Sequence, residues 1–295
     1  MMNFETILRM TQKKLFKAIK REYGALYEKG AWLLVKGEAP ILLVAHLDTV
    51  HKEPVRDICK TTDGNILMSP QGIGGDDRCG VYALLSVYER ARIKPWLLFT
   101  CDEEIGGVGA SYFCEAFEWQ EIPKELDDVK CIVEIDRKGK NDAVYYECAN
   151  RDFEDYITSK GFETQYGSYS DICDVAPTLG VAAVNLSSGY YNAHTQHEYI
   201  NIAELNATID KVLGIVEDSC GNSFPKYKYE RQEPIYTKIA GNYWKVTHNK
   251  PLSDEFTQMY DELLEIYSPE ELDEYRQSCG DSVIRELYEI DVMRG

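Results

Sequence analysis

Short apolar runs that alternate with helical patterns constrain the fold of this chain more than any other feature. The runs are four to six residues long and are bounded by turn signals, at 31–35, 41–45, 96–100, 131–135, 143–146 and 181–186. Apolar residues at three- and four-residue steps predict helices at 4–23, 81–93, 153–160 and 202–216. Continuous apolar strands between helices predict an α/β sandwich whose sheet is covered on both faces. Sites in such a sheet are built at the strand ends.

Composition and charge limit the kind of partner. Hydrophobic residues make up 44% of the 295 residues and charged residues 28%, which is enough apolar material for a sizeable core. With 32 Lys+Arg against 50 Asp+Glu, the formal charge is −18. A nucleic-acid binder that works by bulk electrostatics is therefore excluded, because the protein would repel a polyanion.

The acidity is concentrated at the C-terminus. Residues 251–295 hold thirteen Asp/Glu and three Arg, a net charge of −10 that leaves −8 for the rest. The segment 222–250 lacks periodicity and is expected to be a connector, whereas the Tyr and Leu residues after it keep a helical period. We therefore expect a main domain over 1–221, and over 222–295 a connector followed by an acidic, helical C-terminal extension.

The cysteines and the absence of long apolar stretches indicate a location. The nine cysteines are odd in number, are never closer than thirteen positions and form no Cys-x-x-Cys. This pattern excludes a zinc ribbon and makes a disulfide framework improbable, so we predict a protein of the reducing cytoplasm. No stretch approaches the roughly 20 apolar residues that span a bilayer, so no membrane partner is expected.

Four of the five histidines fall in two short segments of the chain. They are His46 and His51 in the first, and His194 and His197 in the second. His46-Leu47-Asp48 directly follows the apolar run 41–45. In extended backbone both polar side chains lie on one side, so the carboxylate can support the imidazole or share a metal site with it. His51 and His197 are expected to be surface or supporting residues, with substrate contact as the alternative.

Two acidic segments accompany the histidines. The stretch 72–80 contains Gly72, Gly74 and Gly75, but its spacing fits neither a dinucleotide fingerprint nor a Walker A loop, and Asp76-Asp77 would repel a phosphate. The second segment, Asp102-Glu103-Glu104, follows the run 96–100. Adjacent carboxylates at a strand end point in different directions, so one can bind a metal while the other acts as a base.

Two further segments complete the set of polar strand ends. Asp136 lies at the end of the run from 131, and His194 lies in the stretch 192–198 beyond the last strand. Ends of strands in one sheet can converge on one cleft, and a cleft with two histidines and several carboxylates must bind cations or suffer like-charge repulsion. Imidazole and carboxylate ligands without cysteine suit Zn, Mn or Co.

The order and wording of these motifs resemble a known family. The motifs are Ala-His-Leu-Asp-Thr-Val at 45–50, Gly-Asp-Asp-Arg at 75–78, Asp-Glu-Glu-Ile-Gly-Gly-x-Gly-Ala at 102–110, Asp136, and His-x-x-x-Glu at 194–198. They are similar to those of the co-catalytic dinuclear zinc exopeptidases, which include aminopeptidases, tripeptidase T, glutamate-type carboxypeptidases and related deacylases. The resemblance covers about residues 1–221 and implies a three-layer α/β/α sandwich with a mixed, mostly parallel central sheet.

The resemblance also implies a ligand set for two divalent metal ions, zinc, with manganese or cobalt as alternatives. The ligands would be His46, Asp76, Glu104, Asp136 and His194. Asp76 would bridge the ions, with His46 and Asp136 completing one site and Glu104 and His194 the other. In many relatives the peptide that corresponds to Asp76-Asp77 is cis.

Two more residues receive roles from the same resemblance. Asp48 would hold the tautomer of His46, and Glu103 would be the general base that activates a metal-bridging water. The implied protein is a dinuclear metallopeptidase, an aminopeptidase or a di/tripeptidase acting on peptide bonds. The alternatives are an N-acyl amino acid amidohydrolase or deacylase on the same site, and a metal-binding scaffold without catalysis.

One departure from the lidded relatives concerns architecture. Only 58 residues separate Asp136 from His194, too few for the lid and dimerisation domain that tripeptidase T inserts there. The resemblance therefore points to a single-domain form without the lid. The acidic extension could cover the cleft or could mediate self-association, so a homo-oligomer is an open expectation.

Overall fold

The computed structural model describes residues 2–28, 30–146, 148, 150–167 and 169–230, the strands 235–239 and 242–246, and positions 263, 266–268, 272, 287 and 288. The chain divides into two compact units, Met1–Gln165 with Tyr169–Arg231, and Tyr166–Ser168 with Gln232–Gly295. Every residue predicted for the site belongs to the first unit.

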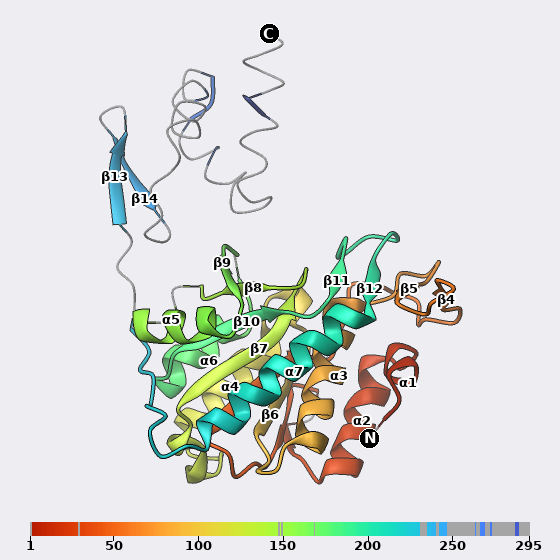
Figure 1. The fold of residues 1–295 in the computed structure, drawn as a ribbon, viewed down its shortest axis with the longest axis horizontal. Helices are drawn as coiled ribbons and strands as arrows, with labels where there is room; N and C mark the ends of the chain where they lie inside the picture. Colours follow the sequence, from red (N-terminus) through yellow and green to blue (C-terminus); the bar gives the residue numbers. More distant parts are fainter. Residues whose placement is uncertain are drawn as a thin grey trace. The chain divides into compact units, whose positions relative to one another are not determined.

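An eight-stranded sheet forms the centre of the first unit (Figure 1). Its order is β1 (Leu26–Glu28), β2 (Trp32–Val35), β6 (Trp96–Thr100), β3 (Ile41–His46), β7 (Cys131–Arg137), β10 (Ala183–Ser187), β8 (Asp142–Val144) and β9 (Glu163–Gln165). The pairs β3 with β6, β3 with β7, β7 with β10 and β8 with β9 are parallel, and the other three are antiparallel. The predicted α/β fold with a mixed, mostly parallel sheet is confirmed, and each of the six predicted runs forms one of these strands.

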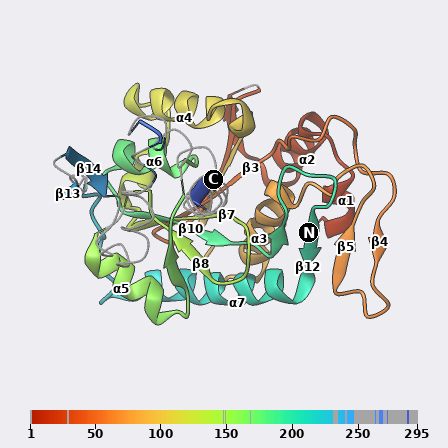
Figure 2. The same cartoon turned by 90° about the horizontal axis from the view of Figure 1, so that it is seen from above.

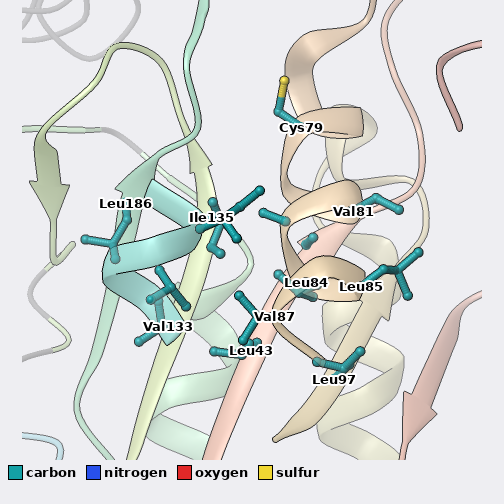
Figure 3. Packing of buried hydrophobic residues seen from close by; sticks show 14 of the residues in the cluster. Leu43, Cys79, Val81, Leu84, Leu85, Val87, Leu97, Val133, Ile135 and Leu186 are labelled. Carbon is teal, nitrogen blue, oxygen red and sulfur yellow. The ribbon is translucent and has the colours of Figure 1, made fainter. Parts of the chain in front are cut away.

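Helices cover both faces of this sheet (Figure 2). One face carries α1 (Phe4–Leu8), α2 (Gln12–Tyr23), α3 (Gly75–Arg90), α5 (Arg151–Ser159) and α7 (Ile202–Ser219), and the other carries α4 (Val108–Glu118) and α6 (Ile172–Leu179). Side chains alternate between the faces along each strand, as strand geometry requires. Leu43 of β3 packs in the cluster under α3 (Figure 3). Its neighbours Leu42 and Val44 pack in the cluster under α4 and α6.

The predicted helix over 4–23 is wrong as a single element. Helix α1 ends at Leu8 and α2 begins at Gln12, because Thr11 is extended with φ −70° and ψ 155°. The carbonyl of Met10, in the break, accepts a hydrogen bond from the Arg78 guanidinium at 3.0 Å. A tertiary contact thus interrupts a pattern that is periodic on both sides.

A second, four-stranded sheet was not predicted. Its order is β11 (Tyr190–Tyr191), β12 (Tyr199–Asn201), β5 (Ile66–Met68) and β4 (Cys59–Lys60). Strands β11 and β12 form a hairpin in which Tyr190 pairs with Ile200. The hairpin holds the segment 192–198, and with it His194, at both ends.

The segment between Asp136 and His194 builds no further domain from its described residues. Strands β8, β9 and β10 join the main sheet, and α5 and α6 pack on its two faces. This agrees with the expected absence of a lid.

Beyond 221 the chain continues to pack on the first unit for about ten residues. Phe224 and Tyr227 are buried in the core, and the Tyr227 N–H donates to the Lys130 carbonyl at 2.8 Å. In the second unit β13 (Ile235–Ile239) and β14 (Asn242–Val246) form an antiparallel hairpin. The helices predicted over 251–295 lie almost entirely outside the described residues, and the boundary at 221 stays a prediction.

Two further findings concern the cysteines and the membrane. The eight cysteines of the described ranges are free. None of the helices described is long and apolar enough to cross a bilayer.

Candidate metal centre

The parallel strands bring the predicted segments to one edge of the main sheet. Strand β3 ends at His46, which pairs with Thr100 at the end of β6. Strand β7 runs parallel to β3 on its other side, with Asp136 near its end. Because carboxyl ends of parallel strands meet at the same edge, the segments after Thr100 and Ile135 begin beside His46.

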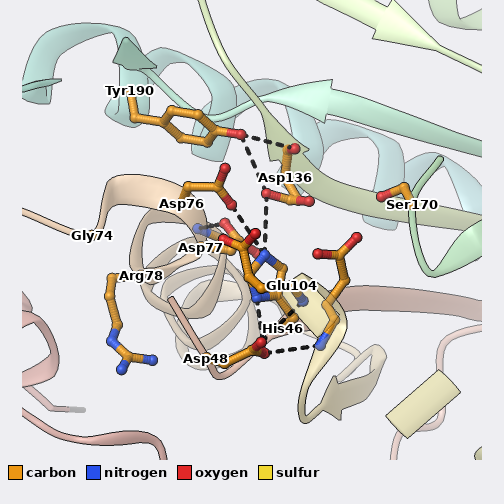
Figure 4. Close-up of polar contacts among 12 residues, drawn as sticks. His46, Asp48, Gly74, Asp76, Asp77, Arg78, Glu104, Asp136, Ser170 and Tyr190 are labelled. Carbon is orange, nitrogen blue, oxygen red and sulfur yellow. Dashed lines mark hydrogen bonds and ion pairs between the residues drawn. The ribbon is translucent and has the colours of Figure 1, made fainter. Parts of the chain in front are cut away.

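The carboxylate of Asp76 lies between two imidazoles (Figure 4 shows the His46 side). Its Oδ1 is 3.1 Å from His46 Nε2, and its Oδ2 is 3.2 Å from His194 Nε2. Asp76 precedes the regular part of α3, and the Asp76-Asp77 peptide is cis. One oxygen for each imidazole is the arrangement that a bridging carboxylate needs.

Each imidazole also faces a second carboxylate. Asp136 Oδ1 lies 3.6 Å from His46 Nε2, and Glu104 Oε2 lies 3.1 Å from His194 Nε2. The structure thus brings the five predicted ligands together as two groups that share Asp76. The two groups differ in exposure, because the His46 side chain is fully buried whereas that of His194 is 53% exposed.

Asp48 supports His46 from behind. Its Oδ1 is 3.2 Å from His46 Nδ1, and its carboxylate accepts the backbone N–H groups of Glu103 at 3.2 Å and Glu104 at 3.0 Å. A carboxylate at Nδ1 assigns a ring proton to that nitrogen, so Nε2 is the nitrogen that faces Asp76 and Asp136. Asp48 therefore lies where the sequence places it, and it also anchors the loop of the expected base.

The phenol of Tyr190 contacts Asp136. Tyr190 Oη lies 3.2 Å from the carbonyl oxygen of Asp136 and 3.4 Å from its Oδ1. The Asp136 N–H donates to Asn185 Oδ1 at 2.8 Å. These contacts orient Asp136 toward His46.

The donor set fits divalent cations. Glu104 Oε1 is buried and has no hydrogen-bond partner in the described structure, although burial of such an oxygen is costly without one. Ligand atoms of His46, Asp76 and Glu104 lie within 4.8 Å of one another. Imidazole nitrogens with carboxylate oxygens are the ligands that Zn, Mn and Co accept.

The electrostatics of the cluster favour positive charge. Burial opposes protonation of His46, but Asp136, Asp48 and Asp76 outweigh it and raise its pKa well above the usual value. Hydrogen bonds to Asp76 and Glu104 raise the pKa of His194 to about 10. Because the carboxylates outnumber the imidazoles, the cluster attracts protons, and a divalent ion would satisfy the same field.

Glu103 lies beside this cluster at the start of a 3₁₀ turn (Glu103–Ile105). Burial, with the nearby carboxylates of Asp171 and Glu104, raises its pKa to about 7. A carboxylate with a pKa near the working pH is suited to accept and return a proton.

Asp77 forms a cluster that sequence reasoning missed. Ligand atoms of His46, Asp77 and Asp136 also lie within 4.8 Å of one another. Asp77 is fully buried; its Oδ1 accepts the Gly80 N–H at 2.8 Å and its Oδ2 has no partner in the described structure. Its neighbour Asp76 was the only one of the two with an assigned role, because adjacent acids in sequence give no signal of which one turns inward.

A buried acidic network behind Glu103 was also missed. Glu134 Oε2 accepts from Ser170 Oγ at 2.5 Å, and Ser170 Oγ accepts from Asn185 Nδ2 at 3.0 Å. Asp171 accepts from the Thr100 hydroxyl. Burial and neighbouring carboxylates raise the pKa of Glu134 well above its usual value. The sequence signal for this network was Glu134, an acidic residue inside the otherwise apolar run 131–135.

Two cysteines of the motifs and the two histidines without a predicted metal role lie in different environments. Cys79 and Cys101 are buried in the core and burial raises the pKa of both thiols, to about 12 for Cys101, so they are packing residues rather than nucleophiles. His197 is exposed, whereas His51 Nε2 lies 2.8 Å from the buried Glu198 Oε2. A cavity of about 210 Å³ borders Asp48 and His51 and lies beside the ligand cluster rather than within it.

Comparisons with known proteins locate the fold. No family model matches the chain, and no curated protein matches it. Among solved structures, a tripeptidase from Staphylococcus aureus subsp. aureus Mu50 is 14% identical with a TM-score of 0.53, covering 74% of this chain and 96% of its own.

Two other structures are similarly close in fold. A TET aminopeptidase from a marine sediment Thaumarchaeota archaeon is 11% identical with a TM-score of 0.55, covering 72% of this chain and 94% of its own. A protein from Thermotoga maritima described as an endoglucanase is 12% identical with a TM-score of 0.53, covering 75% and 98%. At such identities the likeness shows that the fold is shared, so activity must be argued from the site.

Proposed function

We propose that the chain is a metal-dependent exopeptidase, an aminopeptidase or a di/tripeptidase, with a dinuclear site. The observation that carries the proposal is the Asp76 carboxylate, whose two oxygens face His46 and His194 at 3.1 and 3.2 Å. Each imidazole has its own further carboxylate, Asp136 or Glu104. Two of the structures that share the fold are a tripeptidase and an aminopeptidase.

The ligands would hold two divalent ions, zinc or alternatively manganese or cobalt. When bound, such ions polarise a scissile carbonyl and make a water acidic near neutral pH. His46 and Asp136 would hold one ion, Glu104 and His194 the other, and Asp76 both.

Proton transfer falls to Glu103. Its raised pKa of about 7 suits it to take a proton from the attacking water and to deliver it to the leaving amine. Its backbone N–H is fixed by Asp48, which also fixes His46. The base and the ligand are thus positioned by one carboxylate.

The test is cleavage of a substrate panel by the metal-loaded protein. Aminoacyl amides, di- and tripeptides and N-acyl amino acids are incubated with the protein, with and without a chelator. Cleavage that needs a free N-terminus and stops with chelator supports the proposal. Cleavage of N-acyl amino acids alone would assign a deacylase, and metal binding without any turnover would assign a scaffold.

The organisation around the catalytic domain is part of the proposal. The domain would span 1–221, with the acidic extension over 222–295 either covering the cleft or mediating self-association, in a cytoplasmic protein. Self-association is tested by size-exclusion chromatography with light scattering on the full chain and on a chain that ends after Arg231. The same number of protomers per particle in both chains would rule out self-association through the extension.

A further inference from the structure

Three segments that carry predicted ligands meet at one buried carboxylate, that of Glu198. Glu198 lies four residues after His194, and its side chain is 1% exposed. The other two segments are the stretch 46–51, which begins with His46, and the loop 72–76, which ends with Asp76. None of the roles assigned above uses Glu198.

The contacts of Glu198 fill both of its oxygens. Oε1 accepts the Asp76 N–H at 3.0 Å, and Oε2 accepts the Gly74 N–H at 2.9 Å. His51 Nε2 lies 2.8 Å from Oε2, and because an ionised carboxylate only accepts, this nitrogen carries the proton. Three donors from two other segments therefore converge on one side chain from the His194 segment.

The close approach explains the glycines of the loop. A Cβ on Gly75 would lie 2.6 Å from Tyr190 Cβ and 3.2 Å from Glu198 Oε1. A Cβ on Gly72, whose φ is +84°, would lie 2.2 Å from two atoms of the His51 ring. The glycines that do not form a phosphate loop are thus needed where the loop is pressed against Glu198 and His51.

Asp76 depends on this contact more than the strand-borne ligands do. Its φ and ψ, −82° and 104°, are not helical, although it stands at the first turn of α3. Its own backbone N–H is one of the groups that Glu198 accepts. Moving the Glu198 carboxylate would therefore move the peptide from which the Asp76 carboxylate projects.

We propose that Glu198 and His51 are positioning residues that hold Asp76 between His46 and His194. Glu198 fixes the peptides of the loop, and His51 fixes Glu198 by donating from the segment that begins with His46. This inference rests on the proposed metal site, and it concerns residues that do not touch the ions. Residues behind metal ligands typically change metal affinity by about 10- to 100-fold when they are lost.

The experiment uses the full chain, stripped of metal and titrated with Co²⁺. Calorimetry gives the number of ions bound and their affinities, and visible absorption reports the ligand geometry around each ion. The variants are His51→Ala, His51→Gln, Glu198→Gln and the matched control His197→Ala. Circular dichroism of each metal-free variant establishes that it is folded before titration.

The expected order follows from the donors. Glu198→Gln replaces an acceptor oxygen by an NH₂ group that faces N–H donors. His51→Ala removes one of the donors to Glu198. Both variants should bind Co²⁺ about 10- to 100-fold more weakly and should show altered absorption bands. His51→Gln keeps an N–H donor and should restore most of the affinity. His197→Ala should match the unaltered chain because its side chain is exposed.

Several outcomes would overturn the inference. If folded His51→Ala and Glu198→Gln bind Co²⁺ with unaltered affinity and spectrum, neither residue positions Asp76. Equal losses in His197→Ala would show a general effect of removing a histidine. If the unaltered chain binds no divalent ion, the proposed function fails and takes this inference with it, a result distinct from the other two.

Discussion

The two histidines of the candidate centre are held in different ways. His46 ends a central strand, is fully buried, and has its ring fixed by Asp48 at 3.2 Å. His194 lies in the turn between β11 and β12 with φ +64°, and its side chain is 53% exposed. Strand pairing therefore fixes one half of the site, whereas side-chain contacts to loop peptides fix the other.

This difference shows which contacts set the positions of the predicted ligands on each side of the site. On the strand side, neighbouring parallel strands set the positions of His46 and Asp136, and Asp48 adds orientation. On the loop side, Asp76 and His194 come from segments with no place in the main sheet. Their spacing depends on contacts such as those of Glu198, so the loop side should respond to substitutions at residues far from the ions.

The largest expected effect separates the base from the ligand beside it. Glu103→Ala should lower turnover by about 10²- to 10⁴-fold while bound metal is retained, because the proposed role of Glu103 is proton transfer and not metal binding. Turnover is measured at saturating substrate, and bound metal by elemental analysis. Glu104→Ala is the control and should lose metal as well; activity retained in Glu103→Ala would remove its assigned role.

The next effect compares the two histidines through the stability of the metal-free protein. His46→Ala leaves Asp48, Asp76 and Asp136 without their buried partner, which should cost about 3–5 kcal/mol of unfolding free energy. His194→Ala removes a partner of Asp76 and Glu104, but in a half-exposed turn where solvent screens the contacts, so it should cost less, about 0.5–1 kcal/mol. Urea denaturation of the two variants without metal measures both values. Equal losses would contradict the proposed division between a strand side and a loop side.

A smaller effect tests whether Asp48 supports one half of the site, whereas Glu198 supports the ligand that both halves share. The amide of Asp48→Asn accepts a hydrogen bond from His46 more weakly than a carboxylate does. Metal affinity on the strand side should therefore fall by about 10- to 100-fold. Titration of Co²⁺ into Asp48→Asn, Glu198→Gln and the double variant shows which binding event each one weakens. Because Asp76 belongs to both groups, Glu198→Gln should weaken both binding events; equal weakening of both events in Asp48→Asn as well would mean that the halves are not separate.

The smallest effect isolates the contact between the loop and His51. Gly72→Ala and Gly64→Ala both force alanine into positive φ, at +84° and +72°, which costs about 1–2 kcal/mol at each position. Gly64 has nothing within 4 Å of a built Cβ, whereas Gly72 meets the His51 ring. We expect the larger loss of stability in Gly72→Ala, together with a severalfold lower Co²⁺ affinity. Unfolding curves and titrations that do not distinguish the two variants would argue against the His51 contact.

The strand side was predictable from sequence, and the loop side only in part. Runs such as 41–45 and 96–100 are apolar throughout because their strands are buried on both faces, and polar residues just after them mark the site. Strands such as β11 and β12, with two or three residues each, are too short to give a pattern. The helix break at Met10 depends on Arg78, which no local pattern reveals.

The limit of prediction from sequence is clearest for the residues that support the predicted ligands. His51 and His197 are equivalent in the sequence, each close to a predicted ligand. Their roles diverge because Glu198 lies 147 positions from His51 in the chain but within 2.8 Å in space. The resemblance supplied the predicted ligands, but it gave no role to Glu198, Glu134 or Asp77.

The unequal exposure of the two imidazoles also predicts different rates of metal exchange on the two sides of the site. A chelator or an incoming ion meets the His194 side first, since that ring is half open to solvent while His46 is enclosed by Asp48, Asp76 and Asp136. Exchange at the loop side should therefore be the faster process, and the strand side should be the last to lose its ion. A protein with these two rates can pass through a state with one ion whenever metal is scarce.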